Sequence, residues 1–355
     1  MRDAVEAWLR GHADAYLGCD LWSSGVIDKI LISGGKVELG VLLGFAAVRY
    51  APELQERLCA GLQSLPGVEA VGVDVRWQVA AAASRNAQIG QIKNMIAVAS
   101  GKGGVGKSTT AANLALALAY EGAAVGVLDA DIYGPSQPRM LGIEHERPTS
   151  SDGKTIQPPI AYGVKLMSIG LLIDAQQPMV WRGPMVTQAL NQLLSETRWG
   201  ELDYLIIDMP PGTGDAQLTL SQRAPLSGAV IVTTPQDIAL LDARKGLKMF
   251  QKVEVPVLGI VENMSTHICS KCGHEEHIFG AGGGRRMAEE YGVQLLAELP
   301  LDIRIREQAD GGKPTVVAEP DSALGRAYID MARRVAARLS LLSTPPTPTI
   351  TVERT

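Results

Sequence analysis

Short apolar runs recur along the chain from residue 95 onward, and most of them are separated by segments long enough to form a helix. The runs are MIAVAS, AAVGVLDAD, LDYLIIDMPPG, GAVIVTTP, VPVLGIVEN and VQLLAELP. Strands that are apolar on both faces and alternate with helices are typical of a parallel sheet that helices cover on both sides. This part of the chain is therefore predicted to form an α/β domain with a mostly parallel sheet. Its last helix is predicted in SALGRAYIDMARRVAARLSLL.

The first 80 residues follow another pattern, which predicts a small α+β domain. A first helix is followed by two strands around Gly34 and Gly35, a dipeptide suited to a tight hairpin turn. Leucines recur at helical spacing in APELQERLCAGLQSL, and apolar residues alternate in VEAVGVDVRWQV as in a half-buried strand. Cys59 falls in this predicted helix, where a small, buried apolar side chain is expected.

The same patterns set the expected domain boundaries. Residues 81–94 have no clear periodicity and are predicted to be a linker, so the α/β domain is expected to span residues 95–342. Residues 343–355 contain three prolines and no core-forming pattern, which predicts a disordered tail.

Composition and charge narrow the class of protein. The formal net charge is −5 and 46% of the residues are hydrophobic, as is ordinary for a globular protein with a real core. A mildly acidic chain gives no reason to expect a nucleic-acid or membrane-surface partner. No apolar run approaches the roughly 18 residues of a membrane span, and the N-terminus MRDAVEAWLR has the pattern of an amphipathic helix rather than a signal peptide. A cytoplasmic protein is therefore predicted.

The sequence GKGGVGKST at residues 101–109 satisfies the phosphate-loop pattern G-x-x-x-x-G-K-S/T. A strand is predicted before it, over Met95–Ser100, and a helix after it, over Lys107–Tyr120. In such a loop the backbone N–H groups and the helix N-terminus bind phosphate oxygens. Lys107 is expected to reach the β- and γ-phosphates, and the Ser108 hydroxyl to ligate Mg²⁺. The predicted nucleotide-binding residues of the loop are Gly101, Lys102, Gly103, Gly104, Val105, Gly106, Lys107, Ser108 and Thr109.

Aspartates follow two of the predicted strands at the edge where the phosphate loop is expected. Asp129 and Asp131 end one apolar run, and Asp208 ends another, with Gly212 close behind. A strand-end aspartate that faces the loop is the usual partner of hydrated Mg²⁺ in phosphate-loop enzymes. Asp131 and Asp208 are therefore predicted to bind the metal together with Ser108, and the N–H group of Gly212 to meet the γ-phosphate. The alternative for each aspartate, above all for Asp129, is a turn or helix-cap residue.

The loop carries a second lysine, Lys102, which a single phosphate site does not require. One explanation is a solvated surface side chain. The form G-K-G-G-x-G-K-S/T, however, resembles the deviant loop of the family that includes MinD, ParA and the nitrogenase iron protein. That resemblance implies that Lys102 contacts the nucleotide phosphates of the partner subunit across a dimer. A cation supplied in this way would stabilise charge at the transferring phosphate, as an arginine finger does.

Cys269 and Cys272 form a C-x-x-C in a polar, histidine-rich segment that follows a predicted buried strand. Such a pair is compatible with redox chemistry, with half of a zinc site, or with half of an iron–sulfur site. A redox pair usually opens a helix after the first strand of its fold, so the late position disfavours redox chemistry. Zinc would need further ligands, for which His267, His274 and His277 are candidates. A four-iron cluster usually needs four thiolates, which two identical chains would supply.

Many segments in order over residues 94–320 resemble the Mrp/ApbC family of iron–sulfur cluster carrier proteins. They include the phosphate loop, DADIYGPSQPRMLG, LDYLIIDMPPGTGDAQLTL, VENMSTHICSKCGHEEHIFGAGGG and LPLDIRIREQADGGKP. The resemblance implies a homodimer that binds and hydrolyses ATP and works with iron–sulfur assembly proteins. It also implies a labile 4Fe-4S cluster, bridged by Cys269 and Cys272 of each subunit and passed to apo iron–sulfur proteins. Asn263 is then expected to contact adenine, and Asp131 to help orient the attacking water.

The first 80 residues resemble the MIP18-like domain that often precedes the ATPase domain in bacterial members of this family. That domain commonly carries a Pro-x-Cys element after its second strand, where this chain has LLGFAAVRY. The missing cysteine disfavours a cluster-binding role for the domain, and a docking role stays open.

Two other functions remain as alternatives. A positioning ATPase of the MinD/ParA type would need a terminal basic amphipathic helix or basic patches, and it would leave the C-x-x-C without a purpose. A zinc-bridged dimeric ATPase with a regulatory function would use the same cysteines for another metal.

Overall fold

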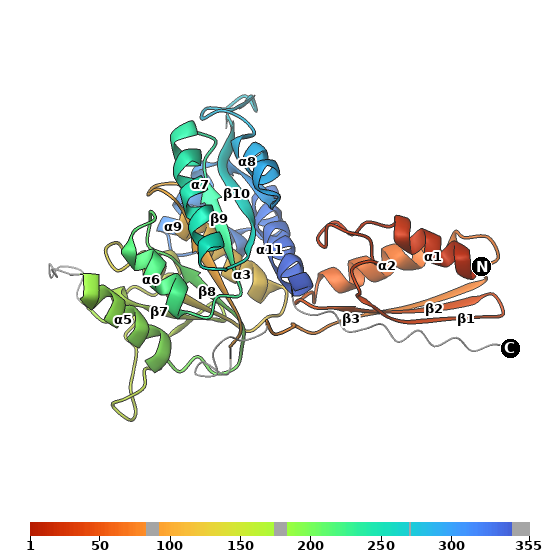
Figure 1. Ribbon diagram of the computed structural model, residues 1–355, viewed down its shortest axis with the longest axis horizontal. Coiled ribbons are helices and arrows are strands. Elements are labelled where there is room, and N and C mark those ends of the chain that lie inside the picture. The colour runs from red at the N-terminus through yellow and green to blue at the C-terminus, as the bar shows by residue number, and fades with distance from the viewer. Residues whose placement is uncertain (83–91, 174–182, 270, 343–355) are drawn as a thin grey trace. The chain divides into compact units, whose positions relative to one another are not determined.

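The computed structural model of the chain describes residues 1–82, 92–173, 183–269 and 271–342 (Figure 1). The contacts within the chain divide it into two compact units, which are described separately. One contains Met1–Ala82 and the described residues from Ala336 onward, and the other lies within Ala83–Val335. Most of the predicted linker and the whole predicted tail, residues 343–355, lie outside the described residues. The last three residues of the predicted linker belong to a strand that begins at Ile92.

The N-terminal unit is a three-stranded sheet with two helices. Its elements are α1 (Arg2–Gly11), β1 (Ile27–Ser33), β2 (Lys36–Leu43), α2 (Tyr50–Gln63) and β3 (Ala70–Trp77). Strands β1 and β2 are antiparallel and β3 adds parallel to β2. The predicted hairpin is confirmed: Gly34 and Gly35 both have positive φ angles, 52° and 83°, as a tight hairpin turn requires. The expected burial of Cys59 is wrong, because its side chain is partly exposed on α2.

The second unit contains a nine-stranded sheet. Its strands are β4 (Ile92–Ala99), β5 (Val125–Asp129), β6 (Ile160–Ala161), β7 (Val164–Ser168), β8 (Leu202–Asp208), β9 (Gly228–Thr233), β10 (Val257–Ile268), β11 (Glu275–Glu276) and β12 (Gln294–Leu301). They follow the order β11-β10-β9-β4-β8-β5-β7-β6, and β12 pairs with β10. Only the β6–β7 and β10–β11 pairs are antiparallel. The prediction of a mostly parallel sheet is confirmed.

Helices cover both faces of this sheet. The helices of this unit are α3 (Lys107–Tyr120), α4 (Gln137–Met140), α5 (Gly183–Glu196), α6 (Asp215–Arg223), α7 (Asp237–Lys252), α8 (Gly283–Tyr291), α9 (Ile303–Asp310), α10 (Thr315–Ala318) and the part of α11 (Ala323–Leu342) up to Val335. Apolar residues of α5, α6, α7 and α8 pack in one cluster with Met95, Ala97 and Ala99 of β4. Ile96 and Val98 alternate with these residues along β4, so they face the other side of the sheet, and they are also fully buried. Helix α3 packs against β4 and β8.

A buried ion pair joins α3 to α11. The Nη2 and Nε atoms of Arg333 lie 2.6 and 2.8 Å from the same carboxylate oxygen of Glu121, which directly follows α3. Both side chains are buried. A buried pair stabilises little by its presence, but the loss of one partner leaves an uncompensated charge in the interior.

We expect Arg333→Met to lower the free energy of unfolding by about 3–5 kcal/mol, because Glu121 is then left buried without its cation. Urea denaturation measures the change. Arg306→Met, which removes an exposed pair with Glu307, should cost less than about 1 kcal/mol. The double variant Arg333→Met/Glu121→Met should recover most of the loss; a double variant as unstable as the single one would contradict the explanation.

Candidate functional site

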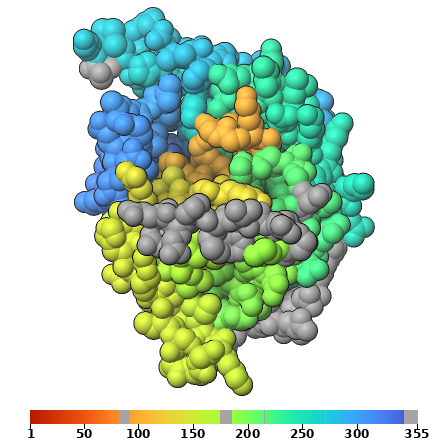
Figure 2. Space-filling view, turned by 90° about the vertical axis from the view of Figure 1, so that its left-hand side faces the viewer, coloured from red at the N-terminus to blue at the C-terminus, as the bar shows by residue number. Residues whose placement is uncertain are grey.

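The phosphate loop connects β4 to α3 at the carboxyl edge of the parallel strands, where ligands bind in open α/β sheets. Gly106 caps the helix with a φ of 83°, and a Cβ atom there would collide with the side-chain amide of Asn263. A Cβ atom on Gly101 would collide with the backbone of Asp242 in α7. Figure 2 shows this part of the chain, in orange, at the surface among yellow, green and teal segments. The predicted strand–loop–helix arrangement is confirmed, with α3 over Lys107–Tyr120.

Lys107 and Asp208 meet at the base of this loop. Lys107 is buried, and its ammonium group pairs with Oδ1 of Asp208 at the end of β8 and lies 3.2 Å from the Ser108 hydroxyl. The strand-end aspartate therefore faces the loop, as the sequence predicts. A phosphate oxygen in the loop would compete with Asp208 for the Lys107 ammonium group, because both are anions within its reach.

Asp129 stabilises the turn that follows β5, next to the phosphate loop. It is fully buried at the end of β5, and it accepts hydrogen bonds from the backbone N–H groups of Asp131 and Gln137 and from the Ser168 hydroxyl. Burial, reinforced by the charge of nearby Asp208, raises the pKa of the Asp129 carboxyl group. These contacts organise the turn after β5, which agrees with the alternative of a turn residue.

Asp131 lies two residues further, in the turn itself. Its side chain is half-buried, and Oδ1 accepts a 3.3 Å hydrogen bond from the N–H group of Gly134. Burial raises the pKa of its carboxyl group, while the Lys107 charge acts in the opposite direction. Asp131 is thus close enough to Lys107 for their charges to interact, and it is more accessible than Asp129 or Asp208.

Gln137 is a residue of this site that the sequence analysis misses. Its side chain is fully buried, and its Nε2 atom donates 2.9 Å hydrogen bonds to the Ser108 carbonyl and to Asp208 Oδ2. Its backbone N–H group donates to Asp129. The local signal is only that of a helix start, with Pro138 in the first turn of α4. Nothing in the sequence pattern links this glutamine to the phosphate loop.

Asn263 and Gly212, two further residues predicted to contact the nucleotide, both lie beside the phosphate loop. Asn263, buried in β10, donates a 2.9 Å hydrogen bond from Nδ2 to the Val105 carbonyl, so it lies directly against the phosphate loop. Gly212 has a φ of 88°, and its N–H group donates to the Ser100 carbonyl at 3.1 Å. That bond would have to break before this N–H group could meet a γ-phosphate, and the contact of Gly212 with the γ-phosphate stays a prediction.

Lys102 is exposed on the outer part of the loop. Its carbonyl accepts a hydrogen bond from the Ser100 hydroxyl, which fixes the backbone rather than the side chain. Within the described ranges, its ammonium group makes no hydrogen bond or ion pair. The side chain is therefore available to a ligand outside its own chain.

The C-x-x-C lies on a hairpin at the far end of β10. Beyond Asn263 the backbone turns at Met264, with a φ of 57°, and the strand continues to Ile268 and pairs with β11. The N–H group of Cys269 donates to the His274 carbonyl at 2.9 Å. Asn263 lies on β10 and Cys269 directly follows the last residue of this strand, so β10 runs from the phosphate loop to the cysteines.

The two thiols lie beside each other at the surface. Cys272 is exposed and Cys269 partly exposed. Hydrogen bonds from the backbone N–H groups of Lys271 and Cys272, and from the Cys272 side chain, lower the pKa of the Cys269 thiol. The thiolate is the form that binds metals, so the hairpin favours the ligand form of Cys269.

Among the described residues, the neighbouring histidines do not complete a metal site with these cysteines. Nδ1 of His267 lies 3.1 Å from the Leu301 carbonyl, and Nδ1 of His277 lies 2.8 Å from the Ser265 carbonyl. Across the described parts of the chain, no three His, Cys, Asp or Glu side chains gather as a metal site would need. The hairpin of one chain therefore presents the two cysteines as a pair.

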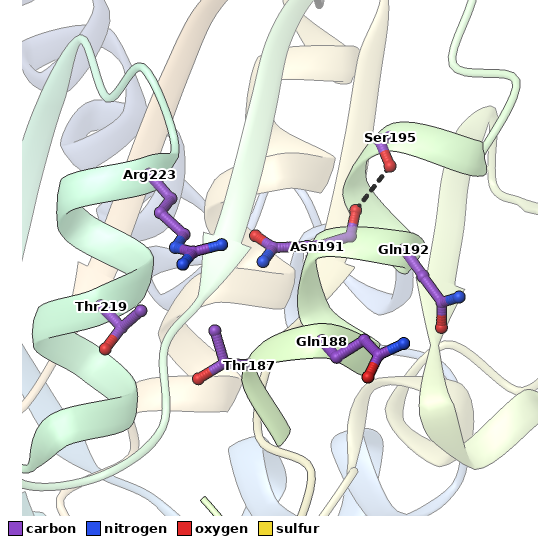
Figure 3. Close-up of a pocket in the computed structure, with 7 residues that line it drawn as sticks. All are labelled: Thr187, Gln188, Asn191, Gln192, Ser195, Thr219 and Arg223. Atoms are coloured by element: carbon purple, nitrogen blue, oxygen red, sulfur yellow. Dashed lines mark hydrogen bonds between the residues drawn. The ribbon is translucent and has the colours of Figure 1, made fainter. Parts of the chain in front are cut away.

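A separate groove of about 520 Å³ lies between α5 and α6. Figure 3 shows the polar side chains that line it: Thr187, Gln188, Asn191, Gln192, Ser195, Thr219 and Arg223. None of the predicted site residues is among them. In the part of the chain that the structure describes, no helix has the length and apolar composition of a membrane span.

Comparison with known proteins agrees with this arrangement. Residues 91–336 match the family described as NUBPL iron-transfer P-loop NTPase, and residues 2–75 match the iron-sulfur cluster assembly protein family. A protein of Pseudomonas fragi named iron-sulfur cluster carrier protein is 60% identical over 274 residues, which cover 76% of this chain and 96% of the relative. A relative of the same name from Synechocystis is 47% identical over 345 residues, which cover 96% of this chain and 98% of the relative.

A solved structure supports the fold. The nucleotide-binding protein of Archaeoglobus fulgidus, determined in complex with ADP, superimposes with a TM-score of 0.58 at 40% identity over 66% of this chain and 91% of its own. The phosphate loop, the strand-end aspartates and the extent of the family match together show that this chain belongs to the family of NUBPL iron-transfer P-loop NTPases.

Proposed function

We propose that this protein is an ATP-hydrolysing carrier that holds a labile 4Fe-4S cluster between two copies of the chain and transfers it to apo iron–sulfur proteins. The observation that carries the proposal is the course of β10: Asn263 on this strand contacts the phosphate loop, and the C-x-x-C begins at Cys269, directly after the strand ends. The names of the relatives, iron-sulfur cluster carrier protein, support the same cargo. Iron–sulfur assembly proteins are the expected donors, and the cytoplasm is the expected compartment.

The homodimer in this proposal is supported by the number of thiolate ligands, because one chain offers only half of those that a four-iron cluster usually takes. A four-iron cluster usually takes four thiolates, and each chain offers two adjacent thiols at an exposed hairpin. Large apolar side chains are also exposed near the phosphate loop, on α7 and after Asp131: Ile238, Leu241 and Tyr133. Exposed apolar groups that gather around a functional site favour a protein partner there.

The residues around the loop fit the Mg²⁺ that the family implies. Asp208 and the Ser108 hydroxyl lie beside Lys107, and a buried oxygen of Gln137 next to Asp208 is unpaired among the described residues. Magnesium in nucleotide sites keeps several waters and takes only one or two carboxylates, so few protein ligands are needed. Ser108, Asp208 and, in the outer turn, Asp131 would hold it. When bound, it offsets the negative charge that develops on the β- and γ-phosphates.

The chain's own residues supply the rest of the hydrolysis. The N–H groups of the loop and the α3 dipole bind the phosphates, and Lys107 neutralises the charge on the transferred group. Asp131, half-buried in the turn after β5, would orient the attacking water. Asn263 would meet the adenine ring from β10, the strand that leads into the C-x-x-C, so one strand would join the nucleotide site to the cluster site.

We expect Lys102→Ala to bind nucleotide with nearly the wild-type affinity but to lose ATP hydrolysis, because a cation from the partner subunit acts mainly on the transition state. Phosphate release measures hydrolysis, and equilibrium titration measures binding. The exposed Lys154 provides the control: Lys154→Ala should hydrolyse ATP as the wild type does.

Mixed dimers test whether Lys102 acts across the interface. Neither Lys102→Ala nor Lys107→Ala should be active alone. A mixed dimer places an intact Lys107 opposite an intact Lys102 at one of its two sites. Equal mixing with free exchange should therefore restore about a quarter of the wild-type rate. A mixture without activity would contradict the role in trans.

The proposed function is tested by anaerobic purification with iron, sulfide and zinc analysis, followed by transfer of the cluster to an apo-acceptor. The account predicts bound iron and sulfide and activation of the acceptor. A colourless dimer that holds stoichiometric zinc under these conditions would favour the zinc-bridged regulatory ATPase instead.

A further inference from the structure

Gln137 lies behind the phosphate loop, at the first position of α4, and contacts two residues of the proposed metal site, Asp208 and Ser108, as well as the buried Asp129. Its side-chain Nε2 atom donates to Asp208 Oδ2 and to the Ser108 carbonyl, each at 2.9 Å, and its backbone N–H group donates to Asp129. Both partners of the side chain are acceptors, so the NH₂ end of the amide must face them. The orientation of the amide is therefore fixed by its surroundings.

Among the residues that the structure describes, the other end of this amide has no partner. Oε1 of Gln137 is buried and accepts no hydrogen bond from any described residue. Buried polar atoms are rarely left unpaired in folded proteins, because the loss of water is then uncompensated. Oε1 belongs to the same planar group as Nε2, so it lies beside the Asp208 carboxylate and the Ser108 backbone. An unpaired acceptor at this place is suited to a donor that arrives with the ligand.

We propose that Gln137 is a positioning residue for the metal–nucleotide complex: Nε2 holds Asp208 in place, and Oε1 accepts a hydrogen bond from a metal-bound water. The inference rests on the proposed function, because it requires a Mg²⁺–nucleotide complex at this loop. Two features of the geometry support it. Gln137 occupies Oδ2 of Asp208 and leaves Oδ1 on the side of Lys107, and it touches the backbone of Ser108, the predicted hydroxyl ligand.

Other side chains at this position would not reproduce both contacts. Methionine has a similar length but neither donates to Asp208 nor accepts from water. Asparagine keeps the amide but is one methylene shorter, so it cannot span the same distance. Residues that do not bind a metal themselves but hydrogen-bond to its ligands keep those ligands in position. Their replacement typically lowers metal affinity by about 10–100-fold.

The test measures metal binding separately from catalysis, on the full chain. Fluorescent ADP is titrated with Mg²⁺ and with EDTA, and free Mn²⁺ is followed by electron paramagnetic resonance. We expect Gln137→Met to bind ADP in EDTA as the wild type does, but to lose at least about tenfold of the Mn²⁺ affinity in the presence of ADP. Gln188→Met, an exposed glutamine of α5, is the matched control and should behave as the wild type.

The outcomes separate the inference from the proposed function. Unchanged Mn²⁺ affinity in Gln137→Met, with a normal wild-type response, would overturn the positioning role and leave the proposed function intact. If the wild type itself shows no metal dependence of nucleotide binding, both fall. If Gln137→Met does not fold, Gln137→Asn replaces it, with the same tenfold loss expected and the same contrary result.

Discussion

Lys107→Ala is expected to abolish nucleotide binding, with a dissociation constant raised on the order of 100-fold or more. Lys107 is the buried cation at the base of the loop, and the carboxylates of Asp129, Asp131 and Asp208 lie within range of its charge. Its removal deletes the phosphate contact and leaves an incoming phosphate facing uncompensated negative charge. The effect should therefore exceed that of losing one ordinary hydrogen bond.

Equilibrium titration with fluorescent ADP measures this loss, and a thermal melt confirms that the variant is folded. Lys252→Ala, at the exposed end of α7, is the matched control and should bind as the wild type does. A folded Lys107→Ala protein whose affinity falls only a few-fold would show that the loop binds phosphate through its backbone alone.

Cys269→Ala and Cys272→Ala are each expected to lose nearly all bound iron and sulfide after anaerobic reconstitution. Each change leaves a dimer with two thiolates where a four-iron cluster usually takes four. Nucleotide binding should persist, because the hairpin lies beyond Asn263 and neither thiol contacts the phosphate loop in the described structure. Iron and sulfide analysis together with the visible absorption of the brown protein measures the loss.

Cys59→Ala supplies the control, since this cysteine lies on α2 of the N-terminal unit. It should retain iron, sulfide and colour at the wild-type level. A cluster that survives in Cys269→Ala or Cys272→Ala would show that other ligands hold it, and the bridging arrangement would then be wrong.

The parts of the site that follow local rules could be predicted from the sequence. The spacing of the glycines predicts the phosphate loop and the helix over Lys107–Tyr120 that follows it. The apolar run before Asp208 predicts that this residue ends a strand. Both signals lie in residues that are close together in the sequence. The mostly parallel sheet follows from the same runs. The short strands β6, β7 and β11 do not, because each is set by pairing with a neighbour rather than by its own pattern.

The contacts that depend on tertiary packing could not be predicted. Gln137 reaches Asp208 across 71 positions of sequence, and no spacing rule connects them. The N–H group of Gly212 is taken by Ser100, which only the fold brings near. The left-handed backbone at Met264 is uncommon for a side chain of this kind. Met264 lies between Asn263, which contacts the phosphate loop, and the hairpin that carries the cysteines. The sequence therefore does not predict how β10 runs from the phosphate loop to that hairpin.

The central claim, that two chains complete one cluster, is tested most directly by native mass spectrometry of the anaerobically reconstituted protein. The account predicts a dimer that carries one four-iron, four-sulfide cluster, and monomers without a complete cluster. A complete cluster on a single chain, or a dimer that carries zinc and no iron, would contradict it.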